Sequence, residues 1–153
     1  MNAKPPLHIV GRAEKSSPPP APLRILVADD DRDTSLMLAA LLRDEGHEVN
    51  TVLRGDEVLE LERLMRPDVL IIDINMPGMS GYAIAREVRE RRGVAAPLLI
   101  AISGVWTRTS ERLRSHAVGF DRYLVKPCEP ADLIGILRAF AQDVRAHSGG
   151  PPM

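Results

Sequence analysis

Apolar residues along this chain change their spacing in a regular way between residues 24 and 145. Three segments each contain a short run of mostly branched aliphatic residues followed by a polar residue: RILVADDD (24–31), VLIID (69–73) and LLIAIS (98–103). Each of these segments predicts a buried strand. HEVNTV (47–52) alternates apolar and polar residues, as an edge strand does, and RYLV (122–125) predicts a fifth strand. Helical spacing follows each strand, and we expect helices over 33–45, 55–65, 82–92, 107–116 and 130 to about 144.

Five strands that alternate with helices predict an α/β protein with a parallel sheet between two helical layers. The uniformly apolar strands belong at the centre and the alternating strand at an edge. We therefore expect a doubly wound, flavodoxin-like (βα)5 three-layer sandwich with strand order 2-1-3-4-5. Ligands of such sheets bind at the carboxyl ends of the strands, next to the switch point between the first and third strands.

Helix faces and ends can also be predicted. We expect Val58, Leu61 and Met65 to point inwards from the second helix and Leu113 to be the main apolar contact of the fourth. The last helix should bury Leu133, Ile136, Leu137 and Phe140. Either Asp31 or Asp33 should cap the first helix, and Arg66 before Pro67 should end the second. The arginines of helix 82–92 (Arg86, Arg89, Arg91 and Arg92) are expected to lie mostly in solvent.

Both ends of the chain differ in composition from its middle. Prolines are concentrated in residues 1–22, and we expect a disordered leader there, a folded domain over 23–146 and a flexible tail over 147–153. After the last predicted helix we expect no attached effector domain, and no basic helix-turn-helix is visible.

Composition narrows the function classes. A formal net charge of -1 gives no overall attraction to nucleic acid or anionic membranes, so neither is an expected partner. The single cysteine, Cys128, excludes an intrachain disulfide and a multi-cysteine zinc site. The apolar runs are too short to cross a bilayer and no signal peptide is visible, so a cytoplasmic location is the default expectation.

Candidate chemistry is concentrated where the predicted strands end. Asp29, Asp30 and Asp31 follow the first strand, Asp73 ends the third, Ser103 ends the fourth and Lys126 follows the fifth. A lone residue of any of these kinds is more often a helix cap, a loop hydroxyl or a surface lysine. Together they predict one pocket, because the carboxyl ends of parallel strands share one edge of the sheet.

That pocket has a definite chemistry. Converging carboxylates should raise one another's pKa values unless a cation sits among them, and oxygen donors with room for water favour Mg²⁺. Asp73 could then be a nucleophile that forms an acyl phosphate, with Lys126 neutralising phosphoryl oxygens, Ser103 donating a hydrogen bond and Gly104 leaving room for the group.

Four segments in order resemble the receiver domains of two-component response regulators. They are ILVADDD (25–31), LIIDINMPGMSG (70–81), LLIAISG (98–104) and YLVKP (123–127), and the resemblance covers nearly all of 24–145. It implies that Asp73 is the phosphoacceptor, that Lys126 binds the phosphate, and that Ser103 and Tyr123 are the switch residues. It also implies that Mg²⁺ is held by Asp30, Asp73 and the backbone carbonyl of Asn75, and by Asp29 through water. A cis peptide between Lys126 and Pro127 is implied as well, and Cys128 stands where the family often has phenylalanine.

The implied function is a phosphorylation switch rather than an enzyme with a separate substrate. A sensor histidine kinase or a histidine phosphotransfer protein would phosphorylate Asp73, and the face over 107–144 would change its affinity for a downstream protein; a phosphorylation-dependent dimer is left open. One alternative is an aspartyl phosphatase of the haloacid-dehalogenase type, but that family has a second acid where this chain has Asn75. Another is a degenerate receiver that only binds partners, which the intact acids, Ser103 and Lys126 disfavour.

Overall fold

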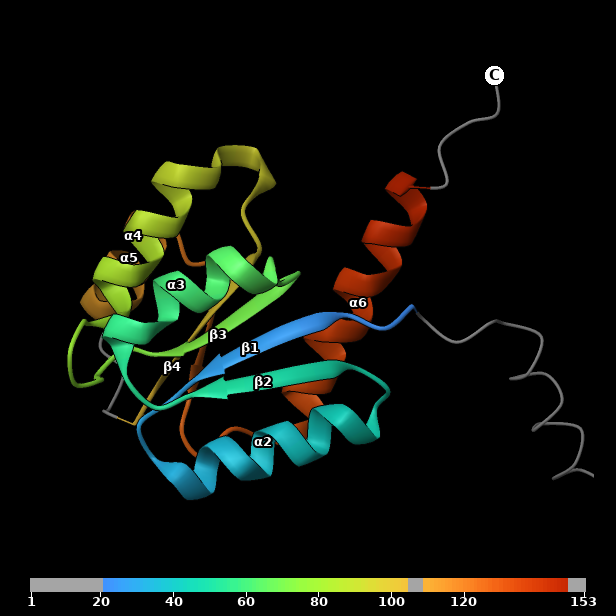
Figure 1. Ribbon diagram of the computed structural model, residues 1–153, viewed down its shortest axis with the longest axis horizontal. Helices are drawn as coiled ribbons and strands as arrows, with labels where there is room; N and C mark the ends of the chain where they lie inside the picture. The colour runs from blue at the N-terminus through green and yellow to red at the C-terminus, as the bar shows by residue number, and fades with distance from the viewer. Residues whose placement is uncertain (1–20, 105–108, 149–153) are drawn as a thin grey trace, which may run out of the picture.

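The computed structural model describes residues 21–104 and 109–148, which form a parallel sheet between two layers of helices (Figure 1). The five strands lie in the order β2-β1-β3-β4-β5, and every neighbouring pair is parallel. This is the predicted fold class and strand order. The elements are β1 (Arg24–Ala28), α2 (Arg32–Asp44), β2 (Glu48–Val52), α3 (Gly55–Met65), β3 (Val69–Asp73), α4 (Gly81–Arg92), the 3-10 turn η1 (Gly93–Ala95), β4 (Leu98–Ser103), α5 (Thr109–Val118), β5 (Arg122–Val125) and α6 (Pro130–Ser148).

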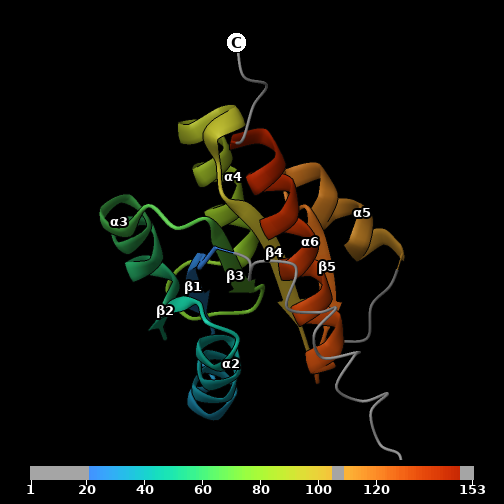
Figure 2. The same ribbon diagram turned by 90° about the vertical axis from the view of Figure 1, so that its right-hand side faces the viewer.

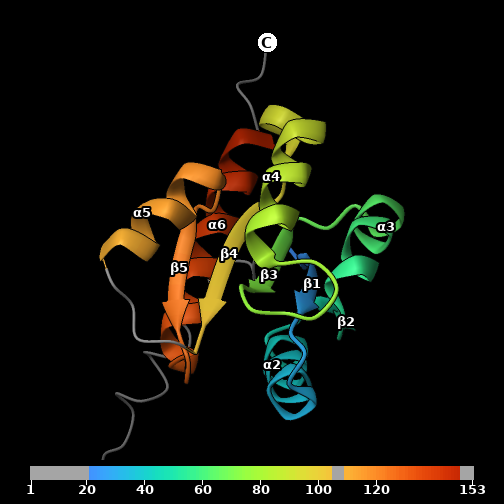
Figure 3. The ribbon, with the colours of Figure 1, turned by 90° about the vertical axis from the view of Figure 1, so that its left-hand side faces the viewer.

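The sheet separates two hydrophobic cores. In β1, Ile25 and Val27 point into the core under α2 and α6, while Leu26 and Ala28 point into the core under α3 and α4. The turned views show α2 and α6 on one side of the sheet and α3, α4 and α5 on the other (Figures 2 and 3). Because successive strand residues point to opposite faces, the central strands must be apolar throughout, and β3 is buried at every position.

The alternation of apolar and polar residues in β2 predicts one buried face, but the structure shows buried residues on both faces of this edge strand. Val49 packs into the core under α2 and α6, and Val52 packs into the core under α3. Glu48, Asn50 and Thr51 are exposed. Helices therefore cover only part of each face of this strand, and the rest of both faces is open to solvent.

Most of the helix ends and faces are confirmed. Asp31 is the N-cap residue of α2, although its side chain accepts a hydrogen bond from the Thr34 hydroxyl rather than from a backbone amide. Arg66 ends α3 with a φ of 50°, in the left-handed region. This agrees with the rule that a residue before proline avoids the right-handed helical region. In α6, Leu133 and Leu137 are buried and Ile136 and Phe140 pack beside them. That helix continues to Ser148, beyond the predicted end near Val144.

Helix α5 contradicts the prediction for Leu113. This side chain is 66% exposed, and the small Ser115 is buried instead on the face towards the rest of the domain. The guanidinium of Arg114 lies over the ring of Tyr82 in α4, 4.4 Å from its centroid. The start of this helix was predicted at Thr107, which lies outside the described residues; in the structure the helix begins at Thr109.

Two of the four arginines of α4 make internal contacts rather than lying in solvent. Arg89 donates to the carbonyl of Gly119 and lies 3.1 Å from the carboxylate of Asp121, which ties α4 to the loop before β5. Arg92 lies 2.8 Å from Glu62, a carboxylate of α3 that is only 1% exposed. The sequence did not single out Glu62, although position 62 lies on the same helical face as Val58 and Met65.

Replacing Arg92 with methionine should lower the free energy of unfolding by about 2–3 kcal/mol, because it leaves the Glu62 carboxylate buried without its partner. The double substitution Glu62→Met/Arg92→Met should recover most of that loss. Urea denaturation measures both. The matched control is Arg91→Met, which removes an exposed pair with Glu87 and should change stability by less than about 0.5 kcal/mol. Equal effects of the two single substitutions would contradict this account.

His47 should make stability depend on pH. Its Nδ1 accepts a hydrogen bond from the backbone N–H of Leu23 at 3.1 Å, which requires that nitrogen to be unprotonated. Burial lowers the pKa of His47 below the usual 6.5, against the opposing charge of Glu45. As the pH falls, the unfolded chain therefore protonates His47 before the folded protein does. The stabilisation by neutral His47 is complete above about pH 6.5 and is lost as the pH falls below that value.

The expected loss is no more than about 1 kcal/mol, since the imidazole is partly solvated. It is measured as the difference in unfolding free energy between the wild type and His47→Gln at pH 7.5 and pH 5.5. A difference that does not change with pH would show that His47 titrates alike in the folded and unfolded states.

Candidate functional site

The carboxyl ends of four strands meet at one end of the sheet, which faces the viewer in Figure 3. The loop after β1 contributes Asp29 and Asp30, β3 ends in Asp73, and Ser103 ends β4. Lys126 directly follows β5. The structure thus brings the residues singled out at the strand ends to one place, because the strands between them are parallel and in register.

Three carboxylates form the acidic cluster of the site. Asp29 is fully buried, Asp73 is 5% exposed and Asp30 lies in solvent. One oxygen from each lies within 4.8 Å of the others. Asp29 is held in place by the backbone N–H of Asp31, which donates to its Oδ1 at 2.9 Å. Asp31 itself caps α2, so the three consecutive aspartates have different roles.

The ammonium of Lys126 connects two of these carboxylates. Its Nζ lies 2.9 Å from Oδ2 of Asp29 and 3.2 Å from Oδ2 of Asp73. Its backbone N–H donates to the carbonyl of Ser103 at 2.8 Å, which fixes the start of the side chain beside β4. Burial lowers the pKa of Lys126, but the hydrogen bond and charge of Asp29 and the charge of Asp73 outweigh it, so the pKa is raised and the group stays cationic.

The carboxyl of Asp73 has a raised pKa, chiefly because it is buried and only in smaller part because carboxylates converge. Burial raises it from 3.8 to about 6, the charge of Asp29 adds to the rise, and the backbone N–H of Asn75 and the ammonium of Lys126 oppose it. At neutral pH Asp73 is thus mostly ionised, and its negative charge is poorly solvated. A poorly solvated carboxylate beside a cation is suited to act as a nucleophile.

The remaining predicted residues lie on the loop after β3 and on strands β4 and β5. The backbone N–H of Asn75 donates to Oδ1 of Asp73 at 3.1 Å, so the loop after β3 holds the carboxylate from its other side. Ser103 is buried, and Tyr123 is half-buried and packs against the core under α3 and α4. The Lys126–Pro127 peptide bond is cis, as the resemblance implies.

Two more residues singled out in the sequence, Gly104 and Cys128, directly follow Ser103 and Pro127 in the chain. Among the described residues, a methyl group at Gly104 would meet only the side chain of Lys126, 3.7 Å from Cδ and 4.0 Å from Cβ, which are ordinary contacts. Cys128 is half-buried and packs against the core under α2 and α6, and burial raises the pKa of its thiol.

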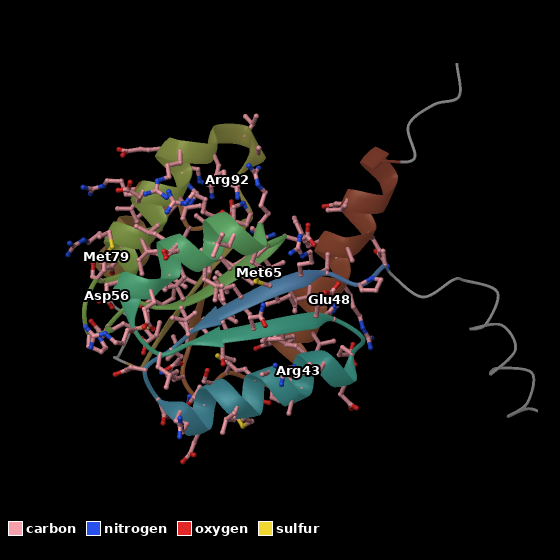
Figure 4. All side chains as sticks on the ribbon, viewed as in Figure 1. Arg43, Glu48, Asp56, Met65, Met79 and Arg92 are labelled. Carbon is pink, nitrogen blue, oxygen red and sulfur yellow. The ribbon has the colours of Figure 1, made fainter. Side chains whose placement is uncertain are left out.

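The loop after Asp73 rests on the start of α3, a contact that the sequence analysis missed. The backbone N–H of Gly55 donates to the carbonyl of Pro77 at 2.9 Å. A methyl group at Gly55 would lie 2.0 Å from the carbonyl oxygen of Met79. Figure 4 shows Asp56 and Met79 side by side at this junction. Glycine at the first position of the predicted helix 55–65 was the available signal, since glycine allows a close backbone approach.

A family model for the response regulator receiver domain matches residues 25–138. The chain belongs to this family. The receiver domain is the phosphorylation-switch module of two-component systems, and the acidic cluster of Asp29, Asp30 and Asp73 is consistent with its phosphoacceptor site. The predicted resemblance is therefore confirmed.

Individual relatives agree with this assignment. The receiver is 35% identical over 116 residues to the DNA-binding response regulator MtrA of Mycolicibacterium paratuberculosis, covering 76% of this chain and 50% of MtrA. It is 37% identical over 117 residues to the phosphate regulon transcriptional regulatory protein PhoB of Rhizobium meliloti, covering 76% of this chain and 51% of PhoB. The chain thus spans about half the length of the curated relatives that it matches.

A solved structure also matches. The chemotaxis response regulator CheY4 of Vibrio cholerae superposes with a TM-score of 0.71 at 30% identity, covering 78% of this chain and 98% of CheY4. Among the residues that the structure describes, no helix is both long enough and apolar enough to cross a membrane.

Proposed function

We propose that this receiver accepts a phosphoryl group on Asp73 from a sensor histidine kinase or a histidine phosphotransfer protein. The observation that carries the proposal is the ammonium of Lys126, shared at 2.9 and 3.2 Å between Asp29 and the carboxylate of Asp73. A cation so placed neutralises negative charge beside an ionised Asp73, which is what transfer of an anionic group to a carboxylate requires.

In the proposed step an oxygen of Asp73 attacks the phosphorus atom of a phosphohistidine. The bond between phosphorus and the imidazole nitrogen breaks, and its electron pair stays on that nitrogen. A new bond joins phosphorus to the Asp73 oxygen, which gives an acyl phosphate. Lys126 then bonds to a phosphoryl oxygen, and the Ser103 hydroxyl donates to another.

The acidic cluster fits a divalent cation. Its donors are carboxylate oxygens within 4.8 Å of one another, and one of the carboxylates faces solvent, which leaves room for water ligands. Asp30, Asp73 and the backbone carbonyl of Asn75 would hold Mg²⁺, and Asp29 would contact it through water. When bound, the ion supplies positive charge to the transferring phosphoryl oxygens.

The output of this switch is a change in affinity for a downstream protein at the face formed by α5, β5 and α6. Each of these elements exposes one apolar side chain that a partner could cover: Leu113, Val125 and Val144. Movement of Ser103 towards the phosphate would let Tyr123 follow and so change this face. Turnover of a separate substrate is no part of the proposal.

The test is incubation of the full chain with acetyl phosphate, with and without Mg²⁺, followed by intact-mass measurement. The expected result is the gain of one phosphoryl group that depends on Mg²⁺ and is released by hydroxylamine, as an acyl phosphate is. Repeated turnover of an unrelated phosphomonoester such as p-nitrophenyl phosphate would instead indicate a phosphatase. Absence of labelling under every Mg²⁺ condition would indicate a degenerate receiver.

A further inference from the structure

A groove lies between the edge strand β2 and helix α3, and it begins beside the acidic cluster, since the carbonyl of its lining residue Val52 accepts a hydrogen bond from the backbone N–H of Asp29. Its volume is about 830 Å³, and residues from Thr51 to Leu64 line it. That volume is within the range of natural ligand-binding pockets. Leu64 at its rim is 74% exposed, which is unusual for a large aliphatic side chain. The groove joins the open edge of the sheet, where an additional chain segment can lie against a strand.

The lining has an apolar floor and an acidic rim. Val52, Leu53 and Leu61 supply the apolar floor, and Leu64 adds an apolar side chain at the rim. Asp56, Glu57 and Glu60 supply three carboxylates, and Arg54, which pairs with Asp56 at 3.0 Å, is the single cation of the lining. In the part of the chain that the structure describes, Glu57 and Glu60 form no ion pair. A fitting occupant is therefore a short apolar stretch flanked by basic residues.

The chain carries such a stretch itself. Residues 4–15 read KPPLHIVGRAEK, in which an apolar core over 7–10 is flanked by Lys4, Arg12 and Lys15 against one acid, Glu14. We call this the basic segment; it lies outside the described residues. Its net charge is opposite in sign to that of the groove, and its apolar core matches the apolar floor.

The connection is long enough for the basic segment to reach the groove. The carbonyl of Leu23 accepts a hydrogen bond from the N–H of Glu48, so the chain enters the domain beside the first residue of β2. Figure 1 shows β1 starting at the end of the sheet where α3 finishes. The twelve residues 11–22 can span up to about 40 Å, whereas a five-residue strand is about 17 Å long. The basic segment can therefore reach any part of the groove.

We propose that the basic segment docks in the groove between β2 and α3 of its own receiver. Docking covers the exposed Leu64 and places Arg12 and Lys15 near Glu57 and Glu60. Because the segment is tethered, its effective concentration is high, and a weak contact is enough to keep the groove mostly occupied. This inference does not depend on phosphorylation of Asp73.

Trypsin tests the proposal, because it cleaves after Arg12 and Lys15 only when those residues are accessible. The full chain is compared with Glu57→Gln/Glu60→Gln and with Leu64→Ser, which leave the cleaved sequence unchanged and add no cleavage site. All three positions are exposed, so these variants should fold. Cleavage after Arg12 and Lys15 should be faster in both variants by about fivefold, equivalent to about 1 kcal/mol of docking free energy.

Two controls identify the occupant. Glu90→Gln/Glu129→Gln removes two exposed carboxylates elsewhere and should leave the cleavage rate unchanged. A synthetic peptide of residues 1–20 gives the rate for the free segment, and wild type should be cleaved more slowly than it. Equal rates for peptide, wild type and groove variants would overturn the proposal. Protection that grows with protein concentration would overturn it too, since the groove would then hold the segment of a second copy.

Discussion

Replacing Asp73 with asparagine should abolish labelling by acetyl phosphate while leaving the domain folded. An amide nitrogen or oxygen cannot form the acyl phosphate, and no other carboxylate of the cluster is bonded to both Lys126 and the backbone of Asn75. Intact-mass measurement after incubation with acetyl phosphate and Mg²⁺ gives the result directly. Circular dichroism shows whether the fold is kept.

The same substitution should stabilise the metal-free protein at pH 7. Burial raises the pKa of Asp73 from 3.8 to about 6, so the folded state holds this proton more tightly than the unfolded state does. The resulting stabilisation is lost as the pH rises between these two values, and at pH 7 the ionised carboxylate destabilises the fold. After allowance for solvent and for Lys126, removing the charge should add about 1 kcal/mol to the unfolding free energy.

The matched control for both measurements is Asp33→Asn in the first turn of α2, an exposed acid outside the cluster. It should keep full labelling and gain no stability. Phosphate taken up on an acyl linkage by the Asp73→Asn protein would show that another residue is the phosphoacceptor. Loss of its fold would show that the carboxylate is needed for structure.

Replacing Gly55 with alanine should lower the free energy of unfolding by about 2–4 kcal/mol. The added methyl group would lie 2.0 Å from a backbone oxygen of Met79, so either α3 or the loop after Asp73 must move. Moving the loop also disturbs the hydrogen bond from Asn75 to Asp73. Urea denaturation measures the stability, and labelling with acetyl phosphate should slow as well.

Gly135→Ala in α6 is the control for this substitution. Nothing lies within 4 Å of a methyl group there, so the replacement should stabilise the protein by about 0.5–1 kcal/mol through the helix preference of alanine. If Gly55→Ala were as well tolerated as Gly135→Ala, the loop would be shown to move freely away from α3.

The sequence was sufficient to predict the strand order and the meeting of Asp29, Asp73, Ser103 and Lys126. Both follow from strand-length apolar runs and from the geometry of parallel sheets, which puts all carboxyl ends on one edge. Those rules need only a local signal for each strand, and the buried strands here provide one as uninterrupted apolar runs.

Contacts between elements could not be predicted in this way. Glu62 has the inward position of an apolar residue, and only its approach to Arg92, thirty residues later, makes a carboxylate tolerable there. Leu113 was assigned inwards because it is the large aliphatic side chain of its helix, yet the small Ser115 faces the domain. In both cases the partner element decides which face is buried, and periodicity alone does not contain that information.

The division of the interior into two cores has a consequence for how sequence changes combine. Side chains of α2 and α6 meet one set of strand residues, and those of α3 and α4 meet the other set. Substitutions on opposite sides of the sheet share no side-chain partners, so their effects on stability should be additive. The residues of one helical layer can therefore change without compensating changes in the other layer. Asp29 and Asp73 lie at the ends of strands that both layers contact, so substitutions in either layer can shift their positions.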